Sequence, residues 1–315
     1  MKNQLSKIHP DLQQVASRSP KFLFSRKNLW FIKRVVKWMP APRTPADILV
    51  ENIFVTGSDG RTKIRLRMYK PKSLTPPAPV LIWLHGGGHV MGKPEMDDLR
   101  CAQYARESAV FIVSVDYRYA PRHPFPTGLE DIYSALKWVE AHSHQIGVDG
   151  KRIAVGGASA GAGLAAALAQ LAHDRQETQP VFQLLVYPML DDRTALRTDI
   201  DDSDNFTWPQ ENNRFGWESY LGEQYGAEDM PAYAVPARRG DLSGLPPAWI
   251  GVGTLDVFYE EDAAYAQRLN ECGVECEMYD VPGAFHGFDV FDPQLPIVQE
   301  FRRSQINALK KYLFR

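Results

Sequence analysis

Short apolar runs alternate with helix-like stretches along most of the chain, and this alternation restricts the fold more than any other feature. Each run has the length of a strand and is continuously apolar, which is typical of strands buried on both faces of a sheet. The runs are Val80–Leu84, Val110–Val115, Ile153–Val155, Phe182–Tyr187 and Ala248–Val252. The helix-like stretches are Glu95–Ser108, Gly128–His142, Ala160–His173, Glu260–Cys272 and Val298–Tyr312. The alternation predicts an α/β fold in which helices cover both faces of a mostly parallel sheet.

Two further strand-like segments precede this alternation. Ile48–Val55 and Thr62–Tyr69 flank a turn signal at Gly57–Gly60, so they are predicted to form a β-hairpin.

Composition excludes several other classes of protein. Hydrophobic residues make up 44% of the 315 residues and charged residues 23%, which is ordinary for a globular protein and unlike a disordered, collagen-like or coiled-coil chain. No apolar run reaches the about 18 residues that a membrane-spanning helix needs. The net charge of −2 gives no general attraction to nucleic acid, so we expect no nucleic-acid partner. Three cysteines cannot form a disulfide framework, and no secretory signal is recognised, so a reducing cytoplasm is expected.

The first 45 residues differ in charge from the rest. They carry ten Lys and Arg residues and a single acid, Asp11. From Phe22 to Trp38 apolar and basic residues interleave as in an amphipathic helix. Such a helix either packs its aromatic side on the body of the protein or lies on a membrane surface. We favour the packed helix, for a reason given below.

A serine lies at the turn between a predicted strand and an alanine-rich helix. The pattern Gly-x-Ser-x-Gly at residues 157–161 centres on Ser159. A sharp strand-to-helix turn of this kind exposes the hydroxyl group, and the helix N-terminus adds partial positive charge nearby. A phosphate-binding loop is the competing interpretation, but the lysine that follows the glycines of such loops is absent. Ser159 is therefore the candidate nucleophile.

A second glycine-rich loop follows the predicted strand Val80–Leu84. It reads His85-Gly86-Gly87-Gly88, and loops of this type supply backbone N–H groups to an oxyanion beside a serine turn. We expect the donors to be the N–H groups of Gly87, Gly88 and Ala160. His85 and His89 have the spacing of metal ligands on a helix, but the intervening glycines disfavour a helix, so no metal is expected.

The serine needs a base, and the base needs an orienting acid. In sites built on this serine turn the acid and then the histidine follow in chain order. His286 lies in a loop just after the strand-like segment Val274–Val281, whereas His173 ends the helix that follows Ser159. Asp256 follows the run Ala248–Val252 and is the favoured acid. The competing acids are Asp191, Asp192, Asp241, Glu260, Glu261 and Asp262.

These residues together resemble the α/β-hydrolases, in the hormone-sensitive-lipase-like branch of bacterial carboxylesterases (family IV). The resemblance covers about residues 45–315. Its markers are the His85–Gly88 loop, residues 116–121 (Asp-Tyr-Arg-Tyr-Ala-Pro), Phe125-Pro126, the turn at Ser159, Tyr187-Pro188, Asp256 and His286-Gly287-Phe288. It implies an eight-stranded, mostly parallel sheet with a Ser–Asp–His triad. It also implies hydrolysis of short- to medium-chain carboxylic esters without a cofactor.

The resemblance further implies one α/β-hydrolase domain over residues 1–315, with a helical cap built from about residues 1–45 and about residues 193–225. This shared role is why we favour a packed N-terminal helix over a membrane helix. The second cap segment is polar but rich in aromatic residues. We expect Phe206, Trp208 and Trp217 to line the substrate pocket, together with His89, which stands where the family usually has an aromatic residue.

The predicted reaction is ester hydrolysis through an acyl-enzyme, with a small-molecule ester as the partner. Two alternatives stay open: a lactone or amide hydrolase on the same site, and a ligand-binding protein that has lost catalysis. A homodimer is common in the resembling family and stays open as well.

Overall fold

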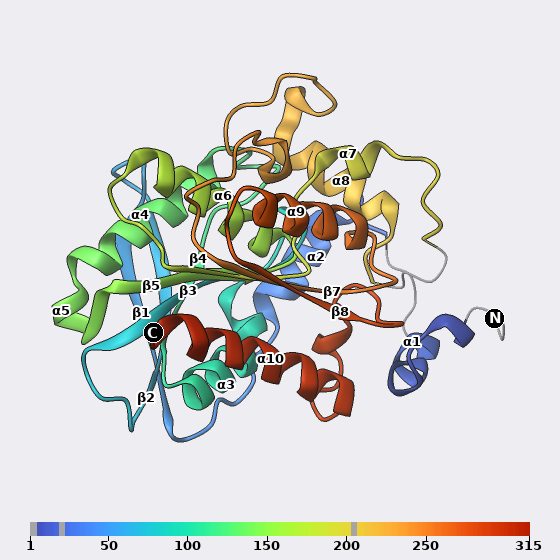
Figure 1. Ribbon diagram of the computed structural model, residues 1–315. Helices are drawn as coiled ribbons and strands as arrows, with labels where there is room; N and C mark the ends of the chain where they lie inside the picture. Colours follow the sequence, from blue (N-terminus) through green and yellow to red (C-terminus); the bar gives the residue numbers. More distant parts are fainter. Residues whose placement is uncertain (1–4, 19–22, 203–206) are drawn as a thin grey trace.

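One eight-stranded sheet runs through the molecule in the computed structural model, which describes residues 5–18, 23–202 and 207–315 (Figure 1). The strand order across the sheet is β1-β2-β4-β3-β5-β6-β7-β8. The strands are β1 (Ile48–Thr56), β2 (Lys63–Pro71), β3 (Ala78–Leu84), β4 (Phe111–Asp116), β5 (Val148–Ala158), β6 (Phe182–Val186), β7 (Ala248–Gly253) and β8 (Cys276–Val281).

Strand direction follows the prediction. β1 and β2 form the expected antiparallel hairpin, and β2 pairs antiparallel with β4. From β4 to β8 all neighbouring strands are parallel. Their carboxyl ends therefore meet at one edge of the sheet, which is where ligands bind in open α/β folds.

Helices cover both faces of the sheet, as predicted. On one face lie α3 (Asp98–Ser108) and α10 (Pro296–Leu313), and on the other lie α4 (Thr127–Ala141), α6 (Ala160–Arg175) and α9 (Tyr259–Glu271) (Figure 1). Each face has its own apolar core, because successive side chains of a strand point to opposite sides. In β3, for example, Ile82 belongs to the core under α4 and α6, whereas Trp83 belongs to the core under α3 and α10.

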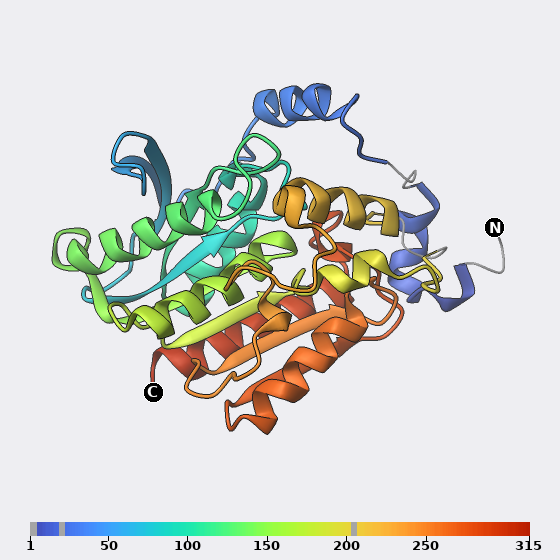
Figure 2. The ribbon, with the colours of Figure 1, turned by 90° about the horizontal axis from the view of Figure 1, so that it is seen from above.

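The remaining helices are short. α7 and α8 lie over one end of the sheet, and α1 and α2 lie at the periphery (Figures 1 and 2). Their bounds are α1 (Gln13–Arg18), α2 (Leu29–Trp38), α5 (Ser143–Ile146), α7 (Asp192–Leu196) and α8 (Gln210–Leu221). Short 3-10 helices span Leu5–Lys7, Pro10–Leu12, Pro94–Asp97, Gly222–Gln224, Pro236–Arg238 and Phe288–Val290.

The N-terminal amphipathic helix is shorter than predicted and is oriented differently. It begins at Leu29, and Phe22 lies outside the described residues. Leu29 and Val36 are buried, but Trp30 is 66% exposed and Trp38 is 72% exposed. The expectation that the aromatic side packs on the body is therefore wrong for these residues. Leu29 and Val36 face the protein, and Figure 2 shows α2 at the rim of the molecule.

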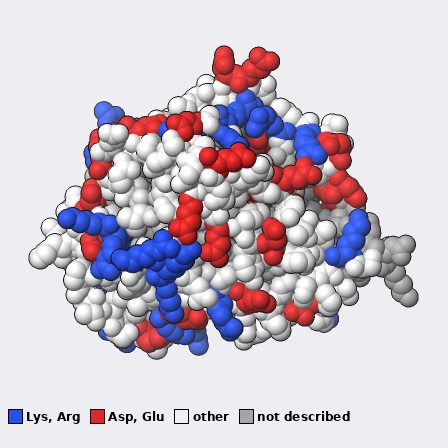
Figure 3. Space-filling model, in the orientation of Figure 1, with Lys and Arg blue, Asp and Glu red and all other residues white. Residues whose placement is uncertain are grey.

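The surface agrees with the small net charge. Acidic and basic side chains interleave over the face seen in Figure 3, with one basic cluster near the C-terminus. Within the part of the chain that the structure describes, no helix is long and apolar enough to cross a membrane.

Candidate active site

Ser159 lies in the sharp turn between β5 and α6. Its backbone has φ of 57° and ψ of −124°, an uncommon conformation for a residue with a side chain. The Ser159 N–H group donates to the Val186 carbonyl at 2.9 Å, and the Ser159 carbonyl accepts from the Gly163 N–H group at 3.0 Å. Strain of this kind costs about 1–3 kcal/mol and persists where the surroundings hold it. The predicted serine turn is thus present.

Glycines allow the backbone to approach itself closely around this turn. A Cβ atom on Gly161 would lie 2.2 Å from the Leu84 carbonyl oxygen, and one on Gly157 would lie 2.5 Å from the Gly161 carbonyl carbon. Neither position has room for a side chain. The end of β3, the end of β5 and the start of α6 are consequently in direct backbone contact.

His286 and Asp256 lie beside the serine. The His286 Nε2 atom is 2.9 Å from Ser159 Oγ, and its Nδ1 atom is 2.7 Å from Asp256 Oδ2. The other carboxylate oxygen of Asp256 accepts from the Phe258 N–H group at 3.0 Å. Each member of this Ser–His–Asp set is 6% exposed. This geometry matches a serine nucleophile, a base in contact with it and an acid that orients the base.

The competing acids are engaged elsewhere. Asp191 pairs with Arg193, Asp192 with Arg238, and Glu260 with Arg197, while Asp241 accepts from the Ser243 N–H group. Glu261 and Asp262 are buried in α9, and burial raises the pKa of both carboxyl groups. Among the described acids, Asp256 is the one that contacts His286.

The glycine loop after β3 lies against the serine turn. A Cβ atom on Gly86 would be 3.4 Å from Ser159 Cβ. Gly87 has φ of 128° and Gly88 has φ of 58°, both in the region that favours glycine. The N–H groups of Gly87, Gly88 and Ala160 donate no hydrogen bond to any described residue, so all three are free to donate to an oxyanion.

The predicted pocket residues gather around this loop, apart from Phe206, which lies outside the described residues. A Cβ atom on Gly88 would lie 1.9 Å from the Trp208 ring, whose centroid is 6.2 Å from that of His286. His89 is buried, stacks on Tyr220 of α8 with centroids 4.0 Å apart, and lies 5.5 Å from Trp217. Burial lowers the pKa of His89 to about 3, so its imidazole is neutral at pH 7.

A buried polar network that the sequence did not indicate lies behind the base. The Tyr187 hydroxyl donates to Asp289 Oδ1 at 2.8 Å, and Arg100 Nη2 donates to Asp289 Oδ2 at 2.8 Å. Arg302 donates to the Asp289 carbonyl at 2.9 Å. The Tyr187 ring stands edge-on to His286, with centroids 4.8 Å apart. Because Asp289 follows His286 by three residues, this network fixes the loop that carries the base.

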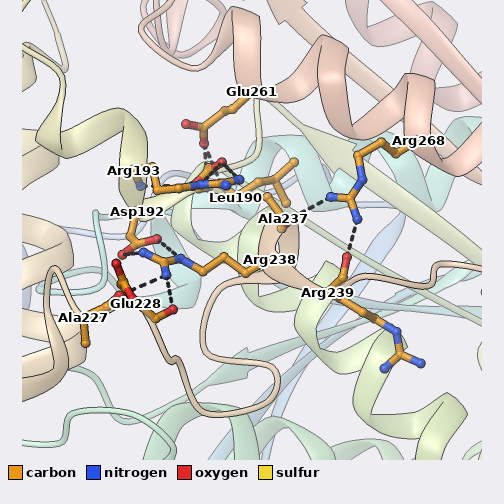
Figure 4. A network of polar contacts seen from close by, with 11 residues as sticks. Leu190, Asp192, Arg193, Ala227, Glu228, Ala237, Arg238, Arg239, Glu261 and Arg268 are labelled. Atoms are coloured by element: carbon orange, nitrogen blue, oxygen red, sulfur yellow. Dashed lines mark hydrogen bonds and ion pairs between the residues drawn. The ribbon is translucent and has the colours of Figure 1, made fainter.

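A second network fixes the helix that follows Asp256 (Figure 4). Glu261 of α9 accepts from the N–H groups of Leu190 and Asp191 at 2.7 and 3.1 Å. Arg238 binds Asp192 and the carbonyls of Ala227 and Glu228. Arg268 donates to the Ala237 carbonyl at 2.6 Å. These contacts join α9 to the segment after β6 and to residues 227–239.

The Thr207 hydroxyl donates to the His286 carbonyl, which ties the start of the α8 segment to the base.

Within the described ranges, no group of three or more His, Cys, Asp or Glu residues has the arrangement of a metal site.

Comparison with known proteins agrees with this geometry. The sequence profile of a family described as having the α/β-hydrolase fold matches residues 81–290. Carboxylesterase NlhH of Mycobacterium tuberculosis is 34% identical over 277 residues, which are 86% of each chain. Ethyl acetate hydrolase of Pseudomonas putida is 30% identical over 279 residues, covering 84% of this chain and 83% of that protein.

Solved structures give the same result. A bacterial heroin esterase superposes with a TM-score of 0.90 at 33% identity, covering 98% of this chain and 99% of that one. The profile match spans about two thirds of the chain, and the relatives named above are similar over more than four fifths of their length. The chain therefore belongs to the α/β-hydrolase family, in the hormone-sensitive-lipase-like branch of carboxylic ester hydrolases.

Proposed function

We propose that this esterase hydrolyses short- to medium-chain carboxylic esters through a covalent acyl-enzyme formed on Ser159. The observation that carries the proposal is the continuous contact from Asp256 through His286 to Ser159, at 2.7 and 2.9 Å. The three free N–H groups beside the serine support it, because acyl transfer develops negative charge on the carbonyl oxygen.

In the first half of the proposed reaction Ser159 Oγ attacks the ester carbonyl carbon, and His286 Nε2 takes the hydroxyl proton. Asp256 holds the imidazole and stabilises the imidazolium that forms. The N–H groups of Gly87, Gly88 and Ala160 donate to the oxyanion. The tetrahedral intermediate then collapses, the C–O bond to the alcohol breaks, and the alcohol leaves with the proton from His286.

In the second half a water molecule attacks the acyl carbon while His286 takes one of its protons. The new intermediate collapses, the acid is released, and the proton returns from His286 to Ser159 Oγ. Protons and bonds balance over the cycle, and no cofactor takes part in any step.

We also propose that α8 and the N-terminal segment cover the site as a cap within one α/β-hydrolase domain. The Phe24 N–H group donates to Asn212 Oδ1 of α8 at 2.8 Å, and the Phe24 ring lies 5.5 Å from Trp208. A Cβ atom on Gly216 of α8 would be 2.8 Å from the Gly88 carbonyl oxygen. These contacts support a cap that reaches the oxyanion loop.

The acyl-chain preference rests on the crowding of the oxyanion loop by Trp208, Trp217 and Tyr220, which favours a small acyl group. The name of the Pseudomonas putida relative, an ethyl acetate hydrolase, agrees with a short acyl chain. We also propose a reducing cytoplasm as the location, because three cysteines cannot form a disulfide framework.

The test is hydrolysis of p-nitrophenyl esters from acetate to palmitate by the wild type, Ser159→Ala and a control, Ser58→Ala, in the exposed hairpin turn. We expect kcat/KM to peak at short chains, to fall by at least about 10⁴-fold in Ser159→Ala, and to stay unchanged in the control. No turnover by the wild type would favour an amide or lactone hydrolase, or a binding protein. Turnover that survives in Ser159→Ala would exclude Ser159 as the nucleophile.

A further inference from the structure

Helix α2 presents an apolar face to solvent. Phe31, Val35 and Trp38 recur at i, i+4 and i+7, so they share one side of the helix. They are 56%, 51% and 72% exposed, whereas Leu29 and Val36 on the opposite side are buried. Trp30 flanks this face, and its ring is 6.0 Å from that of Phe31 in an edge-on arrangement. The face formed by Trp30, Phe31, Val35 and Trp38 is called the outer face of α2.

Five basic side chains occur on α2 and in the segments that flank it in the sequence. They are exposed, and none of them forms an ion pair with a residue that the structure describes. They are Arg26, Lys27, Arg34, Lys37 and Arg43. No acidic residue occurs between Leu12 and Ala46 in the sequence. Positive charge without nearby acids in the sequence is therefore combined with exposed aromatic rings on α2 and its flanking residues.

The helix is fixed in this orientation by a few specific contacts. Lys33 lies on the protein-facing side, where its Nζ atom donates to the Ala120 carbonyl at 3.1 Å and lies 4.8 Å from the Tyr119 ring centroid. Lys93 donates to the carbonyls of Lys37 and Met39 at the end of the helix, at 3.2 and 2.7 Å. The Ala120 N–H group donates to the His89 carbonyl at 2.9 Å, which links this anchor to the loop beside the candidate active site.

We propose that the outer face of α2 docks the enzyme on a lipid surface that carries anionic headgroups. Tryptophan and phenylalanine rings partition into the headgroup region, and Lys and Arg side chains bind the anionic groups around them. Each basic residue near such a surface strengthens binding by about fivefold at moderate salt. The aromatic face supplies the apolar contact, and the five cations supply the preference for anionic lipid.

A second copy of the chain fits this face less well. A symmetric dimer would bring the outer face against itself, because a twofold interface uses the same patch on both subunits. Arg34 and Lys37 of α2 would then approach the same cations of the second copy, with no carboxylate between residues 12 and 46 to neutralise them. An anionic bilayer, in contrast, carries the negative charge that attracts these cations.

The test is flotation of the full-length protein with lipid vesicles, which requires no turnover and therefore stands or falls separately from the proposed esterase activity. Vesicles of phosphatidylcholine alone are compared with vesicles that also contain phosphatidylglycerol, at low and at high ionic strength. The variants are Phe31→Ser with Trp38→Ser, and Arg34→Gln with Lys37→Gln. The matched controls are Phe54→Ser on β1, where Phe54 is 63% exposed, and Arg303→Gln with Lys310→Gln on α10.

We expect the wild type and both controls to float with the anionic vesicles at low ionic strength and to dissociate at high ionic strength, since salt screens the attraction. Both α2 variants should bind at least about tenfold more weakly, with unchanged thermal unfolding. Failure of the wild type to float, equal flotation with phosphatidylcholine alone, or α2 variants that bind like the controls would each overturn the proposal. So would a stable dimer in sedimentation equilibrium that Phe31→Ser with Trp38→Ser dissociates.

Discussion

The serine turn and helix α2 are opposite extremes within one chain. At the serine turn, backbone atoms of β3, β5 and α6 touch, and added Cβ atoms would have no room. At α2, two side chains are buried, and the helix is held largely by hydrogen bonds from Lys33 and Lys93. Close backbone contact limits the residue types that fit, so the first region leaves a specific sequence pattern. An exposed helix accepts many residues, so its pattern is compatible with several orientations.

The largest effect on stability is expected from adding a side chain where the backbones meet at the serine turn. In Gly161→Ala the new Cβ atom would meet the Leu84 carbonyl oxygen at 2.2 Å. The strand and helix must separate, which should lower the free energy of unfolding by about 3 kcal/mol. Urea denaturation measures this change. Gly240→Ala is the control, because nothing lies within 4 Å of its added Cβ atom, and it should change stability by less than about 0.5 kcal/mol. Equal stability of the two variants would contradict the close contact.

An intermediate effect is expected from lowering the pH, through protonation of His89, which follows the glycine loop after β3. Its pKa is about 3 in the folded chain, against an ordinary value of 6.5. Between these values the unfolded chain binds a proton that the folded chain does not, so stability falls as pH drops below about 6.5. From pH 7 to pH 5 His89 should account for about 2 kcal/mol of lost stability.

The measurement is urea denaturation at both pH values for the wild type, His89→Asn and the exposed-residue control His144→Asn. His89→Asn should lose about 2 kcal/mol less than the other two proteins on this change of pH. The same loss in all three proteins would show that His89 is already solvated in the folded state.

The smallest effect is expected at α2. Trp30 is 66% exposed, so Trp30→Ser should change the free energy of unfolding by less than about 0.5 kcal/mol. Trp83→Ser is the comparison, since Trp83 is fully buried and its loss should cost about 3–5 kcal/mol. Thermal or urea unfolding of both variants measures the contrast. A large loss in Trp30→Ser would mean that α2 packs on the body in solution, as the sequence first suggested.

The sequence predicted the parts of the molecule that depend on local spacing. The order of apolar runs predicted the parallel sheet, and Ser159, Asp256 and His286 were named because each follows a strand at one edge of it. The extent of β5 was underestimated, because Lys151 and Arg152 interrupt the apolar pattern although they lie within the strand. The strand β5 thus extends beyond the apolar run from which it was predicted.

Contacts between distant residues could not be predicted in this way. Arg100 and Asp289 are 189 positions apart, and no short motif links them. Their pairing depends on α3 and the loop after β8 meeting on the same side of the sheet. The orientation of α2 could not be predicted for a different reason. Its hydrophobic side contains both aromatic and aliphatic residues, and the spacing does not say which of them face the protein.

The backbone contact at Gly161 has a consequence for how the site responds to developing charge. Because Leu84 and His85 touch the start of α6, direct backbone contacts hold the glycine loop beside Ser159. A dipole that already points at the oxyanion needs no reorientation when the charge appears, whereas water must reorient around it. In the proposed reaction, the N–H groups are oriented when the chain folds, so their reorientation adds little to the barrier of each turnover.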